Sequence, residues 1–296
     1  MDNTSQVYHK SVLVKEVIAY LEPQPNKVYV DATFGGGGHT REILKAQPNA
    51  KVIAFDWDQE AIDKNGPVLI EEFGERIELI RGNFAHITPL LKKRNILKID
   101  GILADFGTAQ TQIQTKPGLS FGQKTALDMR MSSGFYKITA RDIVNNASEN
   151  ELNHIFFTYG EEPKARAVAR AIVNYRVKKK INTTDDLVQI INSVIPKGNR
   201  RINPATKVFQ ALRIVVNDEL NNIKSLLAQS INLLNSGGRL ICISFHSLED
   251  RLVKQFFKEN GSLFTNLTPK VIMAQLEEIE KNPSARSAKL RAAERK

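Results

Sequence analysis

The chain has 296 residues, of which 42% are hydrophobic and 25% charged, an ordinary composition for a soluble globular protein. No apolar run approaches the roughly 18 residues of a membrane span, and the chain opens without a hydrophobic signal region. These features predict a cytoplasmic protein with no membrane partner. The single cysteine, Cys242, excludes an internal disulfide, and the five scattered histidines give no spacing typical of zinc, so no metal is expected.

Strand-like and helix-like patterns alternate along the first hundred residues. Helices are predicted over 11–22, 39–47, 59–73 and 87–94, and strands over 27–33, 51–56, 76–81 and 99–106. The last of these strands is almost entirely apolar, as expected when helices cover both faces of a sheet. The alternation predicts an α/β fold with a parallel sheet.

The alternation stops after residue 106. Residues 107–140 are rich in Gly, Thr, Gln and Ser and show no period. Helices are then predicted over 148–160, 163–180, 183–195 and, as one long amphipathic helix, 205–235, before a strand at 236–245. The chain therefore predicts a discontinuous sheet domain, 1–107 with 205–296, interrupted by a helical insert at 108–204.

The net charge is +10, from 42 Lys and Arg against 32 Asp and Glu. Basic residues gather in four runs, at 92–94, 176–180, 197–201 and 284–296. Any single run could equally be solvated surface or a disordered tail, with no role in binding. Four such runs together favour a nucleic-acid partner.

Four consecutive glycines follow the first predicted strand in DATFGGGGHT, residues 31–40. Glycine in a structured segment lowers stability by about 0.5–1 kcal/mol relative to alanine. Four glycines in a row are therefore expected to serve a turn whose backbone lets a ligand come close. A Walker loop would need a lysine that is absent, and a dinucleotide GxGxxG fits at Gly35 and Gly37 but meets Thr40 at its third position. The remaining option is the related turn that holds S-adenosylmethionine, which Asp31 precedes in the expected way.

The other predicted strands also end in residues suited to such a ligand. Asp56 ends the second strand, where a carboxylate accepts both ribose hydroxyls, whereas Asp58 is interpreted as a helix cap. Phe84 follows the third strand and is expected beside the adenine, and Asp105 ends the fourth. For Trp57 two roles remain as alternatives: packing on the adenine, or packing in the hydrophobic core. Open α/β sheets bind ligands at this carboxyl edge.

These motifs, taken in order, resemble a known family: ribosomal RNA small subunit methyltransferase H, the RsmH or MraW family. The resemblance covers almost the whole chain. The matching stretches are HKSVLVKEVIAYL, DATFGGGGHT, FDWDQEAI, GNF, DGILADFG, LDMRM, YGEE, NPATKVFQALRIVVNDEL, SGGRLICISFHSLEDR and PSARSAKLR.

The resemblance implies a Rossmann-like S-adenosylmethionine-dependent methyltransferase sheet with a small inserted all-α domain for substrate recognition. The implied reaction is methylation of the N4 amine of a cytidine in 16S ribosomal RNA, at the decoding site of the small ribosomal subunit. The family's cofactor-binding positions map to Gly37, Gly38, His39, Asp56, Phe84, Asp105 and Gln112. Because the amine of cytosine is a weak nucleophile, a hydrogen-bond acceptor for its N–H groups should help catalysis. Asp105 is the candidate for this catalytic role. The alternative is that Asp105 only binds the cofactor.

Two further motifs carry open alternatives. In SFHSLEDR, His246, Glu249, Asp250 and Arg251 are assigned either to substrate contact or to local buried polar pairing. In LDMRM, Arg130 contacts a phosphate or forms an ion pair. His39 is interpreted as a helix-start residue rather than an acid or base.

The loop after the fourth strand departs from the family pattern. DLGVSSPQLD of the family is DFGTAQTQIQ here, with Ala109, Gln110 and Thr111 in place of two serines and a proline. This change keeps two other hypotheses open: a methyltransferase with a different substrate, and an RNA-binding ribosome assembly factor without catalysis. A nicotinamide oxidoreductase is disfavoured by Thr40. Monomer and homodimer are both open.

Overall fold

The computed structural model describes residues 11–107, 110–196 and 203–296. The chain forms two compact units: residues 1–109 with 220–296, here called the sheet unit, and residues 110–219, the helical unit. The sequence expected the helical segment to end at 204. The structure extends it to 219 because helix α10 (Ala205–Val216) buries its apolar face in the core of the helical unit.

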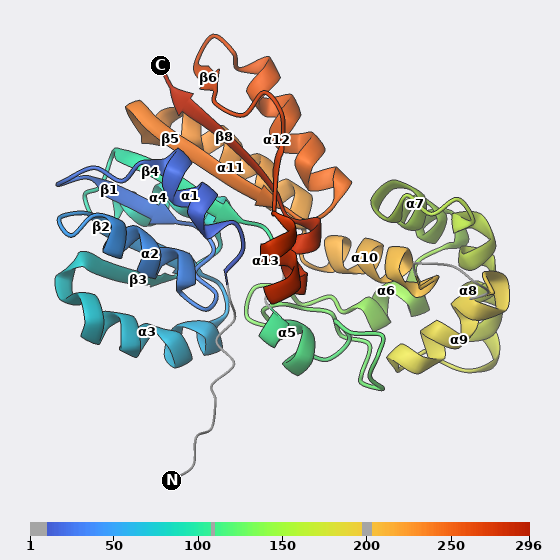
Figure 1. Ribbon diagram of the computed structural model, residues 1–296. Coiled ribbons are helices and arrows are strands. Elements are labelled where there is room, and N and C mark those ends of the chain that lie inside the picture. Colours follow the sequence, from blue (N-terminus) through green and yellow to red (C-terminus); the bar gives the residue numbers. More distant parts are fainter. Residues whose placement is uncertain (1–10, 108–109, 197–202) are drawn as a thin grey trace. The chain divides into compact units, whose positions relative to one another are not determined.

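The sheet unit is built on one mixed sheet with the strand order β3-β2-β1-β4-β5-β8-β6, and β7 pairs with β8 (Figure 1). The first five strands of that order are parallel, and β8 is antiparallel to its neighbours. The strands are β1 (Val28–Asp31), β2 (Lys51–Asp56), β3 (Ile77–Arg81), β4 (Ile99–Asp105), β5 (Leu234–Ser244), β6 (Phe264–Asn266), β7 (Ile272–Met273) and β8 (Lys289–Arg295). This is a Rossmann-like arrangement, which confirms the predicted fold class.

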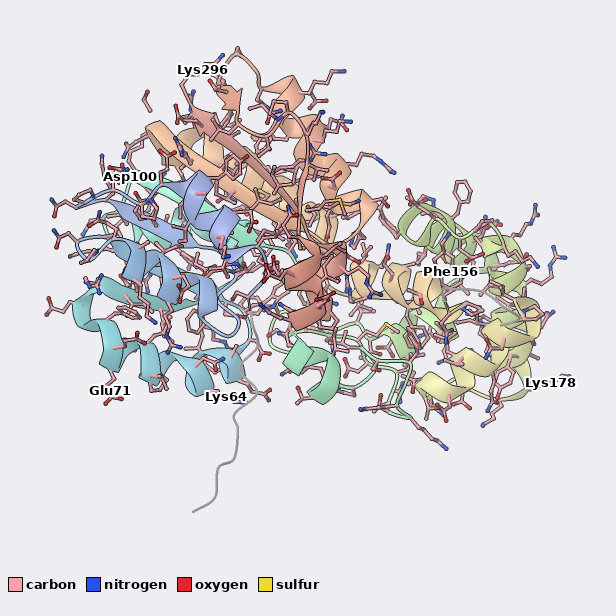
Figure 2. The ribbon with its side chains drawn as sticks, in the orientation of Figure 1. Lys64, Glu71, Asp100, Phe156, Lys178 and Lys296 are labelled. Carbon is pink, nitrogen blue, oxygen red and sulfur yellow. The ribbon has the colours of Figure 1, made fainter. Side chains whose placement is uncertain are left out.

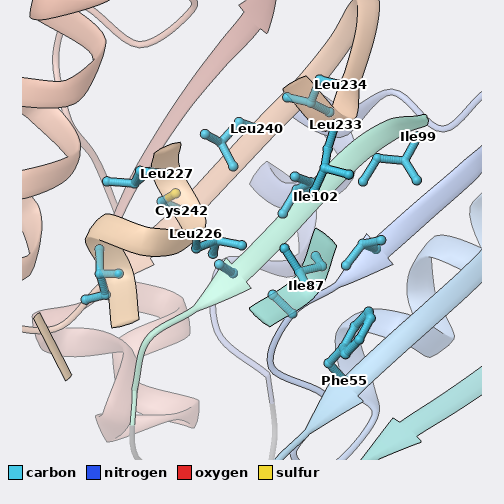
Figure 3. Packing of buried hydrophobic residues seen from close by; sticks show 14 of the residues in the cluster. Phe55, Ile87, Ile99, Ile102, Leu226, Leu227, Leu233, Leu234, Leu240 and Cys242 are labelled. Atoms are coloured by element: carbon cyan, nitrogen blue, oxygen red, sulfur yellow. The ribbon is translucent and has the colours of Figure 1, made fainter. Parts of the chain in front are cut away.

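Helices cover both faces of this sheet. One face packs against α1 (Val14–Leu21), α2 (Gly38–Ala46) and α3 (Gln59–Phe73), and the other against α4 (Ile87–Lys92), α11 (Glu219–Leu233) and α12 (Ser247–Glu259). Successive residues of β5 alternate between the faces: Leu240 and Cys242 join one core cluster and Ile241 and Ile243 the other. Figure 3 shows Leu240 and Cys242 beside Leu226 and Leu227 of α11. Two-sided burial thus explains the apolar strands, and Cys242 is a core residue.

The basic run 284–296 ends in a strand inside the sheet, so its interpretation as a disordered tail is wrong. Strand β8 lies between β5 and β6, with Leu290, Ala292 and Ala293 fully buried. Its charges are used within the fold: the Arg291 guanidinium forms two hydrogen bonds to Asp250, at 2.6 and 3.2 Å. Two short elements precede it, α13 (Leu276–Lys281) and the 3₁₀ helix η3 (Pro283–Ser287).

The helical unit buries its own hydrophobic core, to which Leu152, Phe156, Val168, Ile191 and Leu212 contribute. Its helices are α5 (Gln110–Thr115), α6 (Ala140–Asn146), α7 (Glu149–Gly160), α8 (Ala165–Lys178), α9 (Thr184–Val194) and α10. The predicted capping box of Ser148 and Glu151 is present at the start of α7. Figure 2 labels Phe156, from this core, and the exposed Lys178 at the end of α8.

The single long helix predicted over 205–235 is wrong. The structure has two helices, α10 and α11, and the chain leaves helical geometry at Asn217 and Asp218, where Asp218 has a φ of +48°. The apolar period continues on both sides of this break, which is why the pattern read as one helix. None of the helices in the described ranges is long and apolar enough to cross a membrane.

Candidate functional site

The glycine run forms a tight strand-to-helix turn, which we call the β1–α2 junction (residues 31–40). Gly35 and Gly37 have φ values of +51° and +74°, which residues with a side chain rarely adopt. At Gly38, the first residue of α2, a Cβ atom would lie 2.2 Å from Ser11 Oγ. The turn therefore requires glycine for its backbone geometry at two positions and for close packing at a third.

Asp31 ends β1 and holds this junction together. Its side chain is buried, with 1% of the residue exposed. One carboxylate oxygen accepts the Thr40 hydroxyl at 2.7 Å and the other accepts the Thr33 backbone N–H at 3.1 Å. Burial raises the pKa of Asp31, and nearby His39 opposes that shift. Because almost none of its surface is exposed, Asp31 can act on a ligand through its charge rather than through a direct contact.

Asp56 ends β2 on the neighbouring strand, as the sequence predicted. Its two oxygens accept backbone N–H groups from Gly35 and Asp58, each at 2.8 Å. Each oxygen keeps a second lone pair, so the carboxylate is oriented and can still accept hydrogen bonds from a diol. Burial raises the pKa of Asp56 to about 6. Asp58 begins α3 as its N-cap, which confirms that prediction.

Asp105 ends β4 and faces His39 of α2. Asp105 Oδ2 lies 4.0 Å from His39 Nδ1, and the two side chains are 17% and 5% exposed. Among the described residues, the donor to the Asp105 carboxylate is the Gly107 backbone N–H at 3.4 Å, whereas the Asp105 N–H donates to the Thr33 hydroxyl at 2.7 Å. Burial raises the pKa of Asp105 to about 6. His39 is a helix-start residue, as predicted, and its Nε2 lies 2.8 Å from the Val12 carbonyl oxygen.

The three buried acids have no basic partner. Among the described residues, no lysine or arginine forms an ion pair with Asp31, Asp56 or Asp105, and His39 is the sole cationic group that acts on them. A buried carboxylate without a counter-charge is costly, and a positively charged ligand would relieve that cost. The same cluster would repel a pyrophosphate.

Three aromatic rings lie beside these strand ends. The ring centroids of Phe84 and Trp57 are 6.1 Å apart, and those of Phe84 and Phe106 are also 6.1 Å apart. Phe84 and Trp57 are partly exposed, so each keeps surface on which a flat ring could pack. Asn83, directly before Phe84, is the N-cap of the short 3₁₀ helix η2 (Phe84–His86).

The structure brings together six of the seven predicted cofactor residues, on the β1–α2 junction and at the ends of β2, β3 and β4. The seventh, Gln112, lies in α5 of the helical unit, and its place in the site stays a prediction. Residues 108–109 and the side chains of Gln110 and Thr111 lie outside the described part, as does the basic run 197–201. Sequence reasoning missed Thr33, which supports Asp105; its position in DATF was the available signal.

Two of the four polar residues singled out in SFHSLEDR, His246 and Glu249, pair locally in what we call the β5–α12 junction (residues 244–250), whereas Asp250 pairs with Arg291 of β8. His246 is the N-cap of α12 and forms a capping box with Glu249, whose carboxylate also accepts the Phe245 N–H at 2.8 Å. In the helical unit, Arg130 donates two hydrogen bonds to Asp128, at 2.7 and 2.8 Å. Arg130 is therefore ion-paired within the helical unit, and its contact with a phosphate stays a prediction.

The helical unit also contains a cavity of about 840 Å³ between α6, α7 and α10. Ile138, Ile143, Ile155 and Tyr159 contribute to its largely apolar lining. Two acids in its wall, Asp142 and Glu151, are engaged in capping boxes at the starts of α6 and α7. No group in its lining matches the acidic cluster of the sheet unit, so the two sites differ in chemistry.

The family model described as the MraW methylase family matches residues 6–296. The chain belongs to the MraW methylase family. It is 47% identical over 295 residues to ribosomal RNA small subunit methyltransferase H of Endomicrobium trichonymphae, covering 98% of this chain and 99% of the relative. The relative of the same name from Sulfurihydrogenibium sp. is 45% identical over 293 residues, covering 98% and 99%.

Similar solved structures include an rRNA methylase from Streptococcus thermophilus, with a TM-score of 0.45 and 13% identity over 97% of each chain. For this MraW methylase family member, the glycine turn and the three acids at the sheet edge form the candidate active site of a methyltransferase.

Proposed function

We propose that the chain is an S-adenosylmethionine-dependent enzyme that methylates the N4 amine of a cytidine in 16S ribosomal RNA, at the decoding site of the small ribosomal subunit. Family membership supports the reaction class, and the names of the relatives support RNA of the small subunit as the substrate. The observation that carries the choice of cofactor is the cluster of three carboxylates at the sheet edge, which have no lysine or arginine partner in the part of the chain that the structure describes. It fits a cationic ligand and argues against a nicotinamide dinucleotide.

The residues of the site fit each part of this cofactor. Asp56 would accept the ribose hydroxyls, and Phe84 would pack on the adenine. The backbone N–H groups at the start of α2 suit the ligand's carboxylate, because a helix N-terminus favours negative charge. Asp105 and the charge of Asp31 suit its positive groups.

S-adenosylmethionine supplies an electrophilic methyl group on a positively charged sulfur. In that chemistry the cytidine nitrogen would bond to the methyl carbon as the sulfur–carbon bond breaks, with neutral S-adenosylhomocysteine as the leaving group, and the proton lost from the nitrogen would pass to solvent. Asp105 would accept an N–H of the amine as its lone pair localises, since its carboxylate accepts one long hydrogen bond from the described residues and keeps further lone pairs. Alignment of the two reacting groups by the rigid junction would contribute as much as about 7–11 kcal/mol.

The helical unit is proposed to recognise the RNA. Of the basic run at the end of α8, Arg176 donates to the Val144 carbonyl and Lys179 pairs with Asp186. Lys178 and Lys180 are exposed and could contact phosphates. Action on ribosomal RNA implies the cytoplasmic location that the sequence predicted, and sedimentation of the purified protein would distinguish monomer from homodimer.

Methyl transfer from labelled S-adenosylmethionine to small ribosomal subunits lacking prior modification tests this function. The RNA would be digested and the labelled nucleoside identified by mass. The expected product is N4-methylcytidine from a decoding-site fragment. A different methylated product would redirect the proposal to another substrate, and cofactor binding without transfer to any subunit form would favour an assembly factor.

A further inference from the structure

The ring of His39 has a fixed tautomer. Its Nε2 lies 2.8 Å from the Val12 carbonyl oxygen, which can only accept a hydrogen bond. Nε2 therefore carries a hydrogen. In a neutral ring Nδ1 is then a bare acceptor, and this is the atom 4.0 Å from Asp105 Oδ2.

A bare ring nitrogen and an ionised carboxylate repel each other at this distance. The repulsion disappears if one further proton is held by the pair, either as a carboxylic acid or as an imidazolium. The other charged groups acting on Asp105 are Asp31 of β1 and Glu249 of α12, and both favour retention of that proton. Burial of Asp105 acts in the same direction.

The proposed cofactor and its product differ in charge at this site. S-adenosylmethionine carries a positive sulfur, and S-adenosylhomocysteine does not, whereas their ribose, adenine and amino-acid groups are the same. A positive charge beside Asp105 favours its ionised form.

We propose that in mildly acidic solution His39 and Asp105 hold one labile proton in the ligand-free enzyme, which the cationic cofactor expels and the neutral product does not. This inference rests on the proposed function. It makes His39 a positioning residue, which acts through Asp105 to distinguish the cofactor from its product. Once deprotonated, Asp105 can accept an N–H of the substrate amine. After methyl transfer the sulfur charge is gone, the pair regains its proton, and affinity for the product falls relative to the cofactor.

The affinity ratio of the two ligands tests this coupling in the wild-type enzyme. Dissociation constants for S-adenosylmethionine and S-adenosylhomocysteine would be measured by titration calorimetry from about pH 5 to about pH 7. Because only the deprotonated pair accommodates the cation, preference for S-adenosylmethionine should rise roughly tenfold across this range. Asp56 contacts the same ribose in both ligands, so its own titration cancels in the ratio.

Two variants identify the group responsible. Asp105→Asn should make the ratio independent of pH. His39→Gln should keep the pH dependence of the ratio but move its midpoint to lower pH, because the bare Nδ1 that repels ionised Asp105 is removed. S-adenosylhomocysteine affinity reports whether each variant keeps an intact site.

A constant ratio in the wild type, or a tenfold change that persists in Asp105→Asn, would overturn the inference. Failure of either ligand to bind at any pH would instead contradict the proposed function. Titration in buffers with different ionisation enthalpies gives a second readout. Near pH 6, roughly half a proton or more should be released per S-adenosylmethionine bound, and less per S-adenosylhomocysteine.

Discussion

Two strand-to-helix junctions of the sheet unit each place a histidine beside a buried acid, yet they are built differently. In the β5–α12 junction, Glu249 Oε2 accepts the N–H groups of Phe245 and His246, and Oε1 lies 3.2 Å from His246 Nε2. The acid is satisfied by its own turn. At the β1–α2 junction, His39 faces Asp105 at the end of β4. Among the described residues, one N–H donates to the Asp105 carboxylate, at 3.4 Å, and the neutral His39 ring offers it no hydrogen.

The difference separates a structural acid from a ligand-facing one. Glu249 is 1% exposed and stabilises the start of α12, whereas Asp105 retains 17% exposure and hydrogen-bonding capacity. Residue types alone would not distinguish these pairs, since both are a histidine and a carboxylate beside a strand end. The exposure of the two carboxylates distinguishes them, and the following substitutions test that distinction.

The largest effect is expected at Asp56, the second acid of the ligand-facing edge. Asp56→Asn removes the charge that accepts the ribose hydroxyls and should weaken S-adenosylmethionine binding roughly 100-fold, since hydrogen bonds to charged groups contribute about 1.5–3 kcal/mol each. Calorimetry measures the dissociation constant. Asp58→Asn is the matched control, because asparagine caps helices as well as aspartate does, and its affinity should stay within about threefold. Equal losses in both variants would contradict the assignment of Asp56.

Gly38→Ala tests whether the ligand-facing junction depends on close packing. The new Cβ would lie 2.2 Å from Ser11 Oγ, and relief of this overlap should cost about 1–3 kcal/mol in the free energy of unfolding. Urea denaturation measures the loss. Adding Ser11→Gly removes the clashing hydroxyl and should restore much of the stability in a double-mutant cycle. Simple additivity of the two substitutions would show that this contact is not the cause.

Asp105→Asn should stabilise the ligand-free protein while it weakens cofactor binding. Burial raises the pKa of Asp105 from 3.8 to about 6, so the cost of this buried acid to the folded state builds up as the pH rises from about 4 to about 6 and is complete above that value. The gain should therefore be about 1–3 kcal/mol near pH 7.5 and should vanish as the pH falls to about 4. Thermal unfolding across this range measures it. A variant less stable than wild type at every pH would mean that Asp105 is a structural acid, like Glu249.

The smallest effect on the ligand is expected at the self-capped junction. Glu249→Gln weakens the acceptor of two backbone N–H groups and should lower the free energy of unfolding by about 1–2 kcal/mol. Cofactor affinity near pH 7.5 should remain within about twofold, because Asp105 is already ionised there. Paired denaturation and binding measurements test this. A large loss of affinity with normal stability would place Glu249 in the ligand site and remove the contrast between the two junctions.

The sequence by itself determined the sheet, the glycine turn and the acids that end its strands. Period-two apolar runs, the glycine run and capping residues are local signals, and parallel strands must bring their carboxyl ends to one edge. Asp56, Phe84 and Asp105 could therefore be predicted together before any contact was known. Gln112 could be proposed only from the family resemblance.

Tertiary structure alone decided the rest. The apolar spacing of 205–235 continues on both sides of Asn217 and Asp218. The sequence pattern therefore does not show that two helices are present there, and the tertiary structure does. The basic terminal run becomes strand β8 because its alternating small apolar residues are buried against β5, while Asp250 neutralises Arg291. The pairing of His39 with Asp105 joins segments that are far apart in the chain. The hydrogen bonds of Glu249 depend on which backbone N–H groups the fold turns toward its carboxylate. Such contacts have no sequence period, and they determine which buried acids remain free to meet a ligand.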